Sequence, residues 1–131
     1  MLNLALSYGQ IQQTLKEIAE KEQISEKFLE SIAATIKSKG LVKVKRGAKG
    51  GYELAKSPAQ ITIRELFNAL ESDFFKHDFN NINSEISIVN QTINKMLDDI
   101  SEVIKSHFES ITLETLLNEY YSRNKSQMFY I

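Results

Sequence analysis

The chain has 131 residues, of which 42% are hydrophobic and 25% charged, and it contains no cysteine. This composition is typical of a single globular domain, and the length is too short for two independent ones. The lack of cysteine excludes disulfides, a thiol nucleophile, zinc–thiolate sites and a cysteine-ligated iron–sulfur cluster. No apolar run approaches the ~18 residues of a membrane span, and there is no signal-peptide pattern, so we expect a cytoplasmic protein that binds no membrane.

The net charge of −1 hides an asymmetry along the chain. Residues 1–72 carry 11 Lys and Arg against 8 Asp and Glu, whereas residues 73–131 carry 5 against 9. A basic surface attracts a polyanion and an acidic one is repelled by it. We therefore expect any nucleic-acid contact to lie in residues 1–72, with the acidic half facing away.

Residues 1–8 predict the end of an apolar helix that stops at a glycine. Its uncapped start leads us to expect that an N-terminal helix is truncated in this sequence. A capping box follows, in which Thr14 is the N-cap and Glu17 reaches back to it. The helix that it opens ends near Gln23, and we expect Ile24 to be a buried link to the next helix.

Ser25 is a favourable N-cap residue for a second helix, because its hydroxyl can accept a bond from an amide of the first turn. Gly40 after a basic last turn predicts the end of that helix. Two helices joined by so short a turn indicate a helix-turn-helix, although a helical hairpin in any bundle has the same pattern. The predicted inner face of the second helix consists of Phe28, Leu29, Ile32, Ala33 and Ile36.

A basic hairpin follows directly. Val42 and Val44 alternate with Lys43 and Lys45, which predicts a half-buried strand with a cationic outer face. Residues 46–51 predict a glycine-rich turn before the alternation resumes. No acidic residue interrupts the cations of this region, which are Lys37, Lys39, Lys43, Lys45, Arg46 and Lys49.

Taken alone, a basic hairpin is more often a solvated surface, and its glycines can serve the hairpin geometry only. A helix followed by a flexible cationic hairpin is, however, the outline of a winged helix on DNA. The helix fits the major groove, and the wing lies on phosphates or in the minor groove. The helix and the hairpin together therefore favour DNA binding more strongly than either feature does alone.

A second capping box, Thr62 with Glu65, opens another helix. Residues 73–84 show no period and predict a loop that contains three Phe. Residues 85–108 predict one long helix, longer than its own domain requires. Its apolar stripe follows a nearly heptad spacing, which favours pairing with a second copy over packing on its own domain. The stripe consists of Ile86, Val89, Ile93, Met96, Ile100, Val103, His107 and Ile111.

Thr112 predicts the cap of a last helix that ends near Tyr121, before the polar residues 122–127. The chain then closes on an apolar tail, Met128, Phe129, Tyr130 and Ile131. The predicted fold is thus mainly α with a small β-hairpin wing. It divides into a winged helix-turn-helix domain at 1–72, a loop at 73–84, and a dimerisation helix, short helix and tail at 85–131.

Four segments resemble the winged-helix transcription regulators typified by IscR, NsrR and CymR. They are LKEIAEKEQISEKFLE, LVKVKRGAKGGYELA, ITIRELFNALE and SITLETLL, so that the resemblance covers nearly the whole chain. It implies a homodimeric, sequence-specific DNA-binding regulator of a palindromic operator, commonly a repressor. Gln23 departs from the family, which usually has glycine in that turn.

The resemblance maps recognition-helix contacts onto Lys27 and Glu30, and the wing arginine onto Arg46. A glutamate can accept a hydrogen bond from a cytosine amino group, and an arginine can enter a narrow minor groove. A lysine such as Lys49 suits a phosphate. The expected DNA-binding residues are Ser25, Lys27, Glu30, Lys45, Arg46 and Lys49.

Cluster-binding members of this family place three cysteines before the long helix, where this chain has none, so we expect no cofactor. His77 and His107 lack metal-ligand spacing, and we expect no metal site. Cysteine-free members similar to CymR control cysteine and sulfur metabolism, which sets the same expectation here.

CymR-like chains end in an apolar tail with a terminal isoleucine, as do serine acetyltransferases, whose carboxyl end enters cysteine synthase. The resemblance thus implies cysteine synthase as a partner of Met128, Phe129, Tyr130 and Ile131, by capture of a terminal carboxylate. The alternative is a tail that packs on the dimer or is disordered.

No catalytic constellation is present, and the glycines of residues 47–51 match no nucleotide-binding loop, because a strand and not a helix follows them. We expect no enzyme. The alternative to a sequence-specific regulator is a partner-binding regulatory protein that keeps the winged-helix fold but binds DNA weakly.

Overall fold

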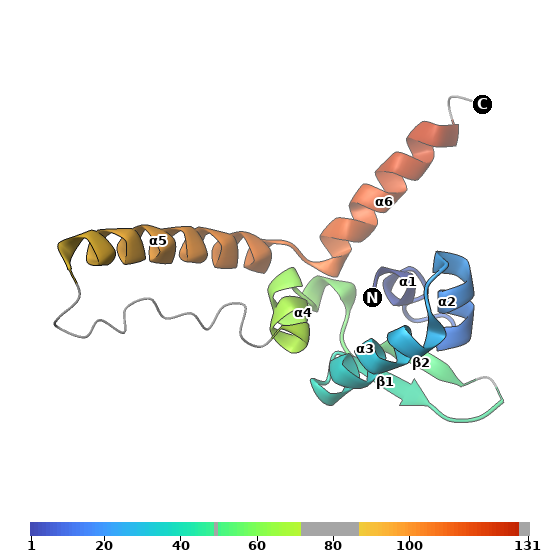
Figure 1. Ribbon diagram of the computed structural model, residues 1–131. Helices are drawn as coiled ribbons and strands as arrows, with labels where there is room; N and C mark the ends of the chain where they lie inside the picture. The colour runs from blue at the N-terminus through green and yellow to red at the C-terminus, as the bar shows by residue number, and fades with distance from the viewer. Residues whose placement is uncertain (49, 72–86, 129–131) are drawn as a thin grey trace.

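The computed structural model describes residues 1–48, 50–71 and 87–128. Helices predominate and there is a single antiparallel hairpin in this part of the chain, which confirms the predicted fold class (Figure 1). No helix in these ranges is long and apolar enough to span a membrane. The elements are α1 (Leu2–Leu6), α2 (Leu15–Glu22), α3 (Glu26–Ser38), β1 (Val42–Lys45), β2 (Gly51–Leu54), η1 (Pro58–Gln60), α4 (Ile63–Leu70), α5 (Ile88–Ser110) and α6 (Leu113–Met128).

Both predicted capping boxes are present. The Thr14 hydroxyl accepts from the Glu17 amide at 3.2 Å, and the Glu17 carboxylate accepts from the Thr14 amide at 2.8 Å. The bond from the Thr14 amide, with one from the Thr14 hydroxyl, holds the pKa of the Glu17 carboxyl below its usual value. Thr62 and Glu65 repeat the arrangement at 3.1 and 3.2 Å and fix the start of α4. Local sequence thus determines where these two helices begin.

The Glu65 carboxylate also pairs with Lys56, which follows strand β2 by two residues. Burial alone would raise the pKa of Glu65, but hydrogen bonds from the Lys56 side chain and the Thr62 backbone, with the Lys56 charge, outweigh burial and lower it. The Lys56 ammonium lies 2.7 Å from the Glu65 carboxylate. The ionised carboxylate is therefore the form that stabilises the fold.

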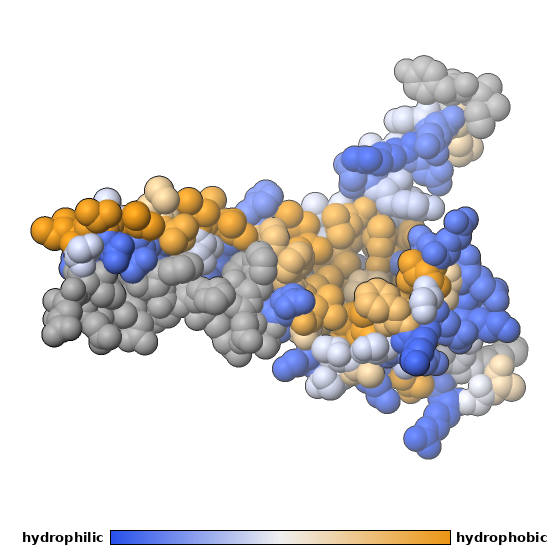
Figure 2. Space-filling view, in the orientation of Figure 1, coloured by the Kyte–Doolittle hydropathy of each residue, from blue (hydrophilic) through white to orange (hydrophobic). Residues whose placement is uncertain are grey.

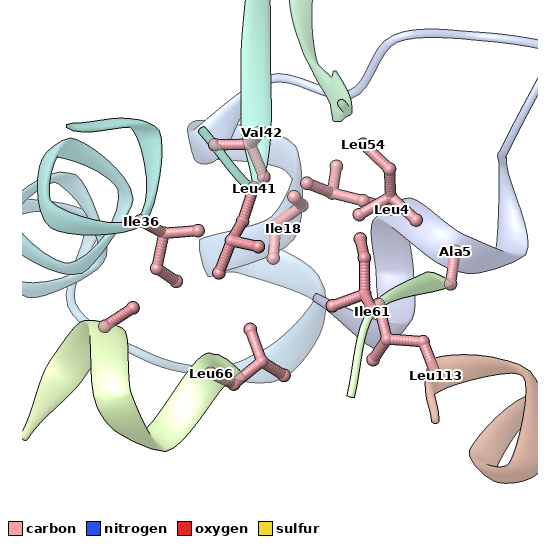
Figure 3. Packing of buried hydrophobic residues seen from close by; sticks show 11 residues of the cluster. Leu4, Ala5, Ile18, Ile36, Leu41, Val42, Leu54, Ile61, Leu66 and Leu113 are labelled. Atoms are coloured by element: carbon pink, nitrogen blue, oxygen red, sulfur yellow. The ribbon is translucent and has the colours of Figure 1, made fainter. Parts of the chain in front are cut away.

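One core joins the helix-turn-helix, the hairpin and the start of α6 (Figure 3). Leu54, Ile61 and Leu113 are its most buried large side chains, at 2%, 0% and 1% exposure. Leu113 comes from beyond the long helix, so residues far apart in sequence build this core together. It is completed by Leu4, Ala5, Ile18, Ile36, Leu41, Val42, Leu66 and Ala69.

The corner between α5 and α6 attaches to the domain through backbone. The Ile63 amide donates to the Ile111 carbonyl at 2.8 Å, and the Leu113 amide donates to the Ile61 carbonyl at 2.9 Å. Phe67 of α4 packs on Phe108 of α5 with ring centroids 4.7 Å apart. From this anchored end α5 extends away from the rest of the molecule (Figure 1).

The C-terminal helix corrects a prediction. We expected it to end near Tyr121, but α6 continues to Met128. The polar residues 122–127 are compatible with an exposed helix, and the Glu119 carboxylate lies 2.6 Å from the Arg123 guanidinium one turn later. The predicted loop at 73–84, and Phe129, Tyr130 and Ile131 of the tail, lie outside the described residues.

Candidate nucleic-acid interface

The helix-turn-helix consists of α2 and α3, joined at Gln23 and Ile24. Gln23 has φ = 55°, the left-handed conformation that glycine adopts most easily. Its amide, and that of Ile24, cap α2 by bonding back into its last turn. Gln23 therefore occupies a position whose backbone geometry explains the glycine usual in the family.

The outer surface of α3 carries the predicted recognition residues. The Ser25 hydroxyl accepts from the Phe28 amide at 3.3 Å, which confirms Ser25 as the N-cap. Lys27 and Glu30 are both exposed on the first two turns. The structure therefore brings Ser25, Lys27 and Glu30 to one accessible helix start, where base edges are read in helix-turn-helix proteins.

Two burial predictions in this region are wrong. Ile24 was expected to be buried and is 42% exposed, and Phe28 was expected on the inner face and is 61% exposed. Leu29, Ile32, Ala33 and Ile36 already fill the inward arc of α3. Phe28 precedes Leu29 by one residue, about 100° around the helix, so its ring lies outside that arc.

The wing is the β1–β2 hairpin, in which Val42 faces Leu54 and Lys45 faces Gly51. The helix-turn-helix holds it by a short antiparallel bridge. The Tyr52 amide donates to the Gln13 carbonyl at 2.8 Å, and the Gln13 amide donates to the Tyr52 carbonyl at 3.1 Å. The wing is thus tied to the segment that leads into α2, a contact that the sequence analysis missed.

Two glycines permit this construction. A Cβ on Gly51 would stand 2.7 Å from the Gln13 carbonyl oxygen, and one on Gly50 would stand 2.2 Å from the Lys45 carbonyl oxygen. Both distances are shorter than real Cβ contacts. The glycine pair therefore lets the hairpin close and approach the helix-turn-helix. The doubled glycine was the only sequence signal of that approach.

The wing cations differ in their partners. Lys43 lies 3.2 Å from the Glu53 carboxylate, which also accepts from the Gln12 amide group at 3.0 Å. The Gln12 bond, followed by the Lys43 bond and the nearby lysine charges, lowers the pKa of Glu53. Lys45 and Arg46 are exposed and, among the described residues, form no ion pair. Lys49 lies outside the described residues.

Val44 was predicted to lie on the buried face of the half-buried strand, but it is 39% exposed. Its neighbour on the same face of the hairpin, Val42, is 4% exposed because it lies over the core. The hairpin extends beyond the core after Val42, so no layer covers Val44. The wing accordingly presents an exposed outer end that carries Lys45 and Arg46.

The α5 helix has no buried residue, and its apolar stripe is exposed. Figure 2 shows the stripe as a continuous orange band along the helix. Of the other residues predicted in the stripe, Ile86 lies outside the described residues, His107 is exposed, and Ile111 follows the end of α5. The large stripe residues and their exposed fractions are Val89 66%, Ile93 45%, Met96 53%, Ile100 48% and Val103 69%.

The residues present do not fit a cysteine-ligated cluster, because the chain has no cysteine. Within residues 1–48, 50–71 and 87–128, no three His, Asp or Glu side chains gather as metal ligands would. His77 lies outside these ranges.

Two known transcriptional regulators are similar in sequence to this chain. The CymR regulator of Bacillus subtilis strain 168 is 31% identical over 131 residues, 100% of this chain and 91% of that protein. IscR of Cronobacter sakazakii is 35% identical over 71 residues, 54% of this chain and 44% of that protein. Both are named as transcriptional regulators and not as enzymes.

Two solved structures of regulators with these names have a fold similar to that of this chain. The structure described as CymR, the global cysteine regulator of B. subtilis, superposes with a TM-score of 0.77 at 29% identity, over 90% of this chain and 87% of that one. The IscR structure from T. potens gives 0.69 at 33%, over 91% and 78%. The family model described as "Rrf2: Iron-dependent Transcriptional regulator" matches residues 1–119. The chain therefore belongs to the Rrf2 family of DNA-binding transcription regulators.

Proposed function

We propose that this chain is a homodimeric repressor that binds a palindromic DNA site, with α3 in the major groove and the wing beside it. The observation that carries the proposal is the exposed pair Lys45 and Arg46, on a wing that the Gln13–Tyr52 bridge ties to the segment leading into the helix-turn-helix. Unpaired cations are available to phosphates, whereas Lys43 must first leave Glu53.

The proposed contacts divide by type. Glu30 accepts from a cytosine amino group, and Arg46 enters the minor groove. Ser25, Lys27, Lys45 and Lys49 orient the protein on the backbone, because hydroxyls, amines and helix N-termini commonly bind phosphate. Together they read one half-site for each protomer.

The second protomer follows from the apolar stripe of α5. A half-exposed isoleucine such as Ile100 gains roughly 1 kcal/mol when a partner covers it, half the value for full burial. Two copies of one residue thus contribute about 2 kcal/mol, roughly 30-fold in the dimer dissociation constant. Several such residues lie along the stripe, which supports a stable dimer whose two-fold matches a palindrome.

The regulated genes and the tail partner are the most specific part of the proposal. The relative from B. subtilis is described as the global cysteine regulator, and we carry sulfur metabolism to this chain on that basis. We propose further that Met128, Phe129, Tyr130 and Ile131 engage cysteine synthase. Met128, the first residue of this segment, is 74% exposed at the end of α6, which supports the proposal.

The test is binding to promoter fragments of the host's sulfur-metabolism genes at several salt concentrations, with and without cysteine synthase. Nanomolar, salt-dependent binding to a palindrome is expected, with loss on Arg46→Ala. Weak binding without sequence preference would instead favour the partner-binding alternative. An effect of the synthase that survives deletion of Ile131 would remove the tail from the proposal.

The dimer needs a separate measurement, by analytical ultracentrifugation. Ile100→Asp places a charge on the stripe and should give monomer. Gln91→Asp adds the same charge to an exposed position on the opposite side of the same helix, about 180° from Ile100, and should remain dimeric. Equal dissociation of the two variants would refute the role of the stripe.

A further inference from the structure

We propose that Phe28 is a specificity-determining residue whose ring reads the C5-methyl group of thymine in the major groove. The inference rests on the proposed function and adds one base contact to those proposed there. Phe28 is 61% exposed at the start of α3, although a phenyl ring gains free energy from burial. Among the residues that the structure describes, Phe28 belongs neither to the core cluster nor to the apolar side chains packed against it.

The capping pattern shows that the position is unusual in this chain. Helices α2 and α4 both have glutamate three residues after the N-cap, and Glu17 and Glu65 return a bond to the cap. The third residue after the cap of α3 is Phe28, whose amide still binds Ser25. Its ring can return no hydrogen bond. The side chain therefore contributes neither to the cap nor to the core, and it is free to contact a ligand.

The place of the ring points to a base edge. Phe28 stands in the first turn of α3, next to Lys27 and two residues before Glu30, and both neighbours are exposed. N-terminal residues of a recognition helix are those that reach into the groove. Ile24, 42% exposed at the turn, enlarges the apolar surface at that point.

The chemistry selects the base. Among the groups that base pairs present in the major groove, the thymine methyl is the apolar one, and phenylalanine is a residue type found against it. The other edges offer donors and acceptors that a phenyl ring cannot pair with. Burying one methyl corresponds to about a fourfold change in affinity.

The experiment is a double-mutant cycle between protein and DNA. Each thymine of a bound half-site is replaced in turn by deoxyuridine, which lacks only the methyl, and affinity is measured for wild type and Phe28→Ala. We expect one or two positions where wild type loses about fourfold, and where Phe28→Ala shows no further loss. Phe28→Tyr keeps the ring and should keep the sensitivity.

The control is Ile11→Ala, which removes another apolar side chain, 70% exposed, from the loop before α2. It should leave the deoxyuridine profile of wild type unchanged. Because the Phe28 ring is exposed, the thermal midpoint of Phe28→Ala should stay close to that of wild type. A changed midpoint leaves the cycle valid, because the comparison is between two DNAs on one protein.

Specific binding without any deoxyuridine-sensitive position would overturn the inference and leave the proposed function intact. So would a sensitivity that persists in Phe28→Ala. Absence of sequence-preferring binding in wild type would overturn both, and that outcome is visible before any thymine is replaced.

Discussion

Replacing Gly51 with alanine tests whether the wing works only when it is tied to the helix-turn-helix. The new Cβ would lie 2.7 Å from the carbonyl oxygen, 2.8 Å from the carbonyl carbon and 3.1 Å from the nitrogen of Gln13. All three atoms are backbone and cannot rotate away. Strand β2 must therefore separate from the segment before α2.

That separation breaks both bonds of the Gln13–Tyr52 bridge, at 2.8 and 3.1 Å. At a net 0.5–1.5 kcal/mol for each hydrogen bond, Gly51→Ala should lower the free energy of unfolding by about 2 kcal/mol. The larger consequence is functional, because a displaced wing no longer holds Lys45 and Arg46 beside α3. Withdrawing these two cations from the DNA would reduce the salt slope of binding by about 2, because each one neutralises about one phosphate charge.

The assay combines urea unfolding with DNA affinity at several salt concentrations. Gly9→Ala is the matched control, since φ at Gly9 is +75° and nothing lies within 4 Å of the added Cβ. Forcing alanine into that conformation costs roughly 1–2 kcal/mol, and the added Cβ does not press on the Gln13–Tyr52 bridge. Similar stabilities with a lower salt slope in Gly51→Ala alone are expected. Unchanged binding by Gly51→Ala, or equal losses in both variants, would refute the reasoning.

Three further predictions test other contacts. Leu113→Ala should lower the free energy of unfolding by about 2–5 kcal/mol, because Leu113 is 1% exposed; urea unfolding measures it, and a loss below 1 kcal/mol would place α6 outside the core. The lowered pKa of Glu65 means that its carboxylate stabilises the fold above its usual value of 4.5 and that this contribution disappears as pH falls through the lowered pKa. Glu65→Gln keeps the capping box, so its stability should depend less on pH between about 5 and 3 than that of wild type, and parallel curves would contradict this. Arg46→Ala should reduce the salt slope of DNA binding by about 0.9, and Lys43→Ala by less, because Glu53 already pairs with Lys43; equal slopes would refute that difference.

The parts of the fold that the sequence predicts well depend on neighbours within a few residues. The capping boxes at Thr14 and Thr62 and the N-cap at Ser25 each join groups three residues apart, so short patterns specify them. The hairpin also follows from local alternation and glycine. These local features are sufficient to predict, from the sequence alone, that a basic wing follows α3.

Contacts between distant segments were not predictable in the same way. The bridge between Gln13 and Tyr52 joins residues far apart through backbone atoms, which every residue type carries. Likewise, nothing in the sequence near Leu113 indicates whether its side chain enters the core or lies on the exposed surface of the helix. The polar residues after Tyr121 suggested that the last helix ends there, because the apolar periodicity disappears when no face of a helix is buried.

Exposed apolar side chains have two proposed roles in this molecule, and the extent of the exposed surface distinguishes these roles. Periodicity alone assigned Phe28 to the core, yet the ring lies outside the arc that Leu29 and Ile36 fill, on the surface that faces the proposed DNA site. The stripe of α5 is equally exposed, but it continues along the whole helix and so offers an area that only another apolar surface can cover. A single exposed ring next to charged residues suits a single methyl in a polar groove, whereas a long band suits its own copy. The pattern in the sequence is apolar in both cases, and the extent of the exposed surface decides between a base contact and a dimer.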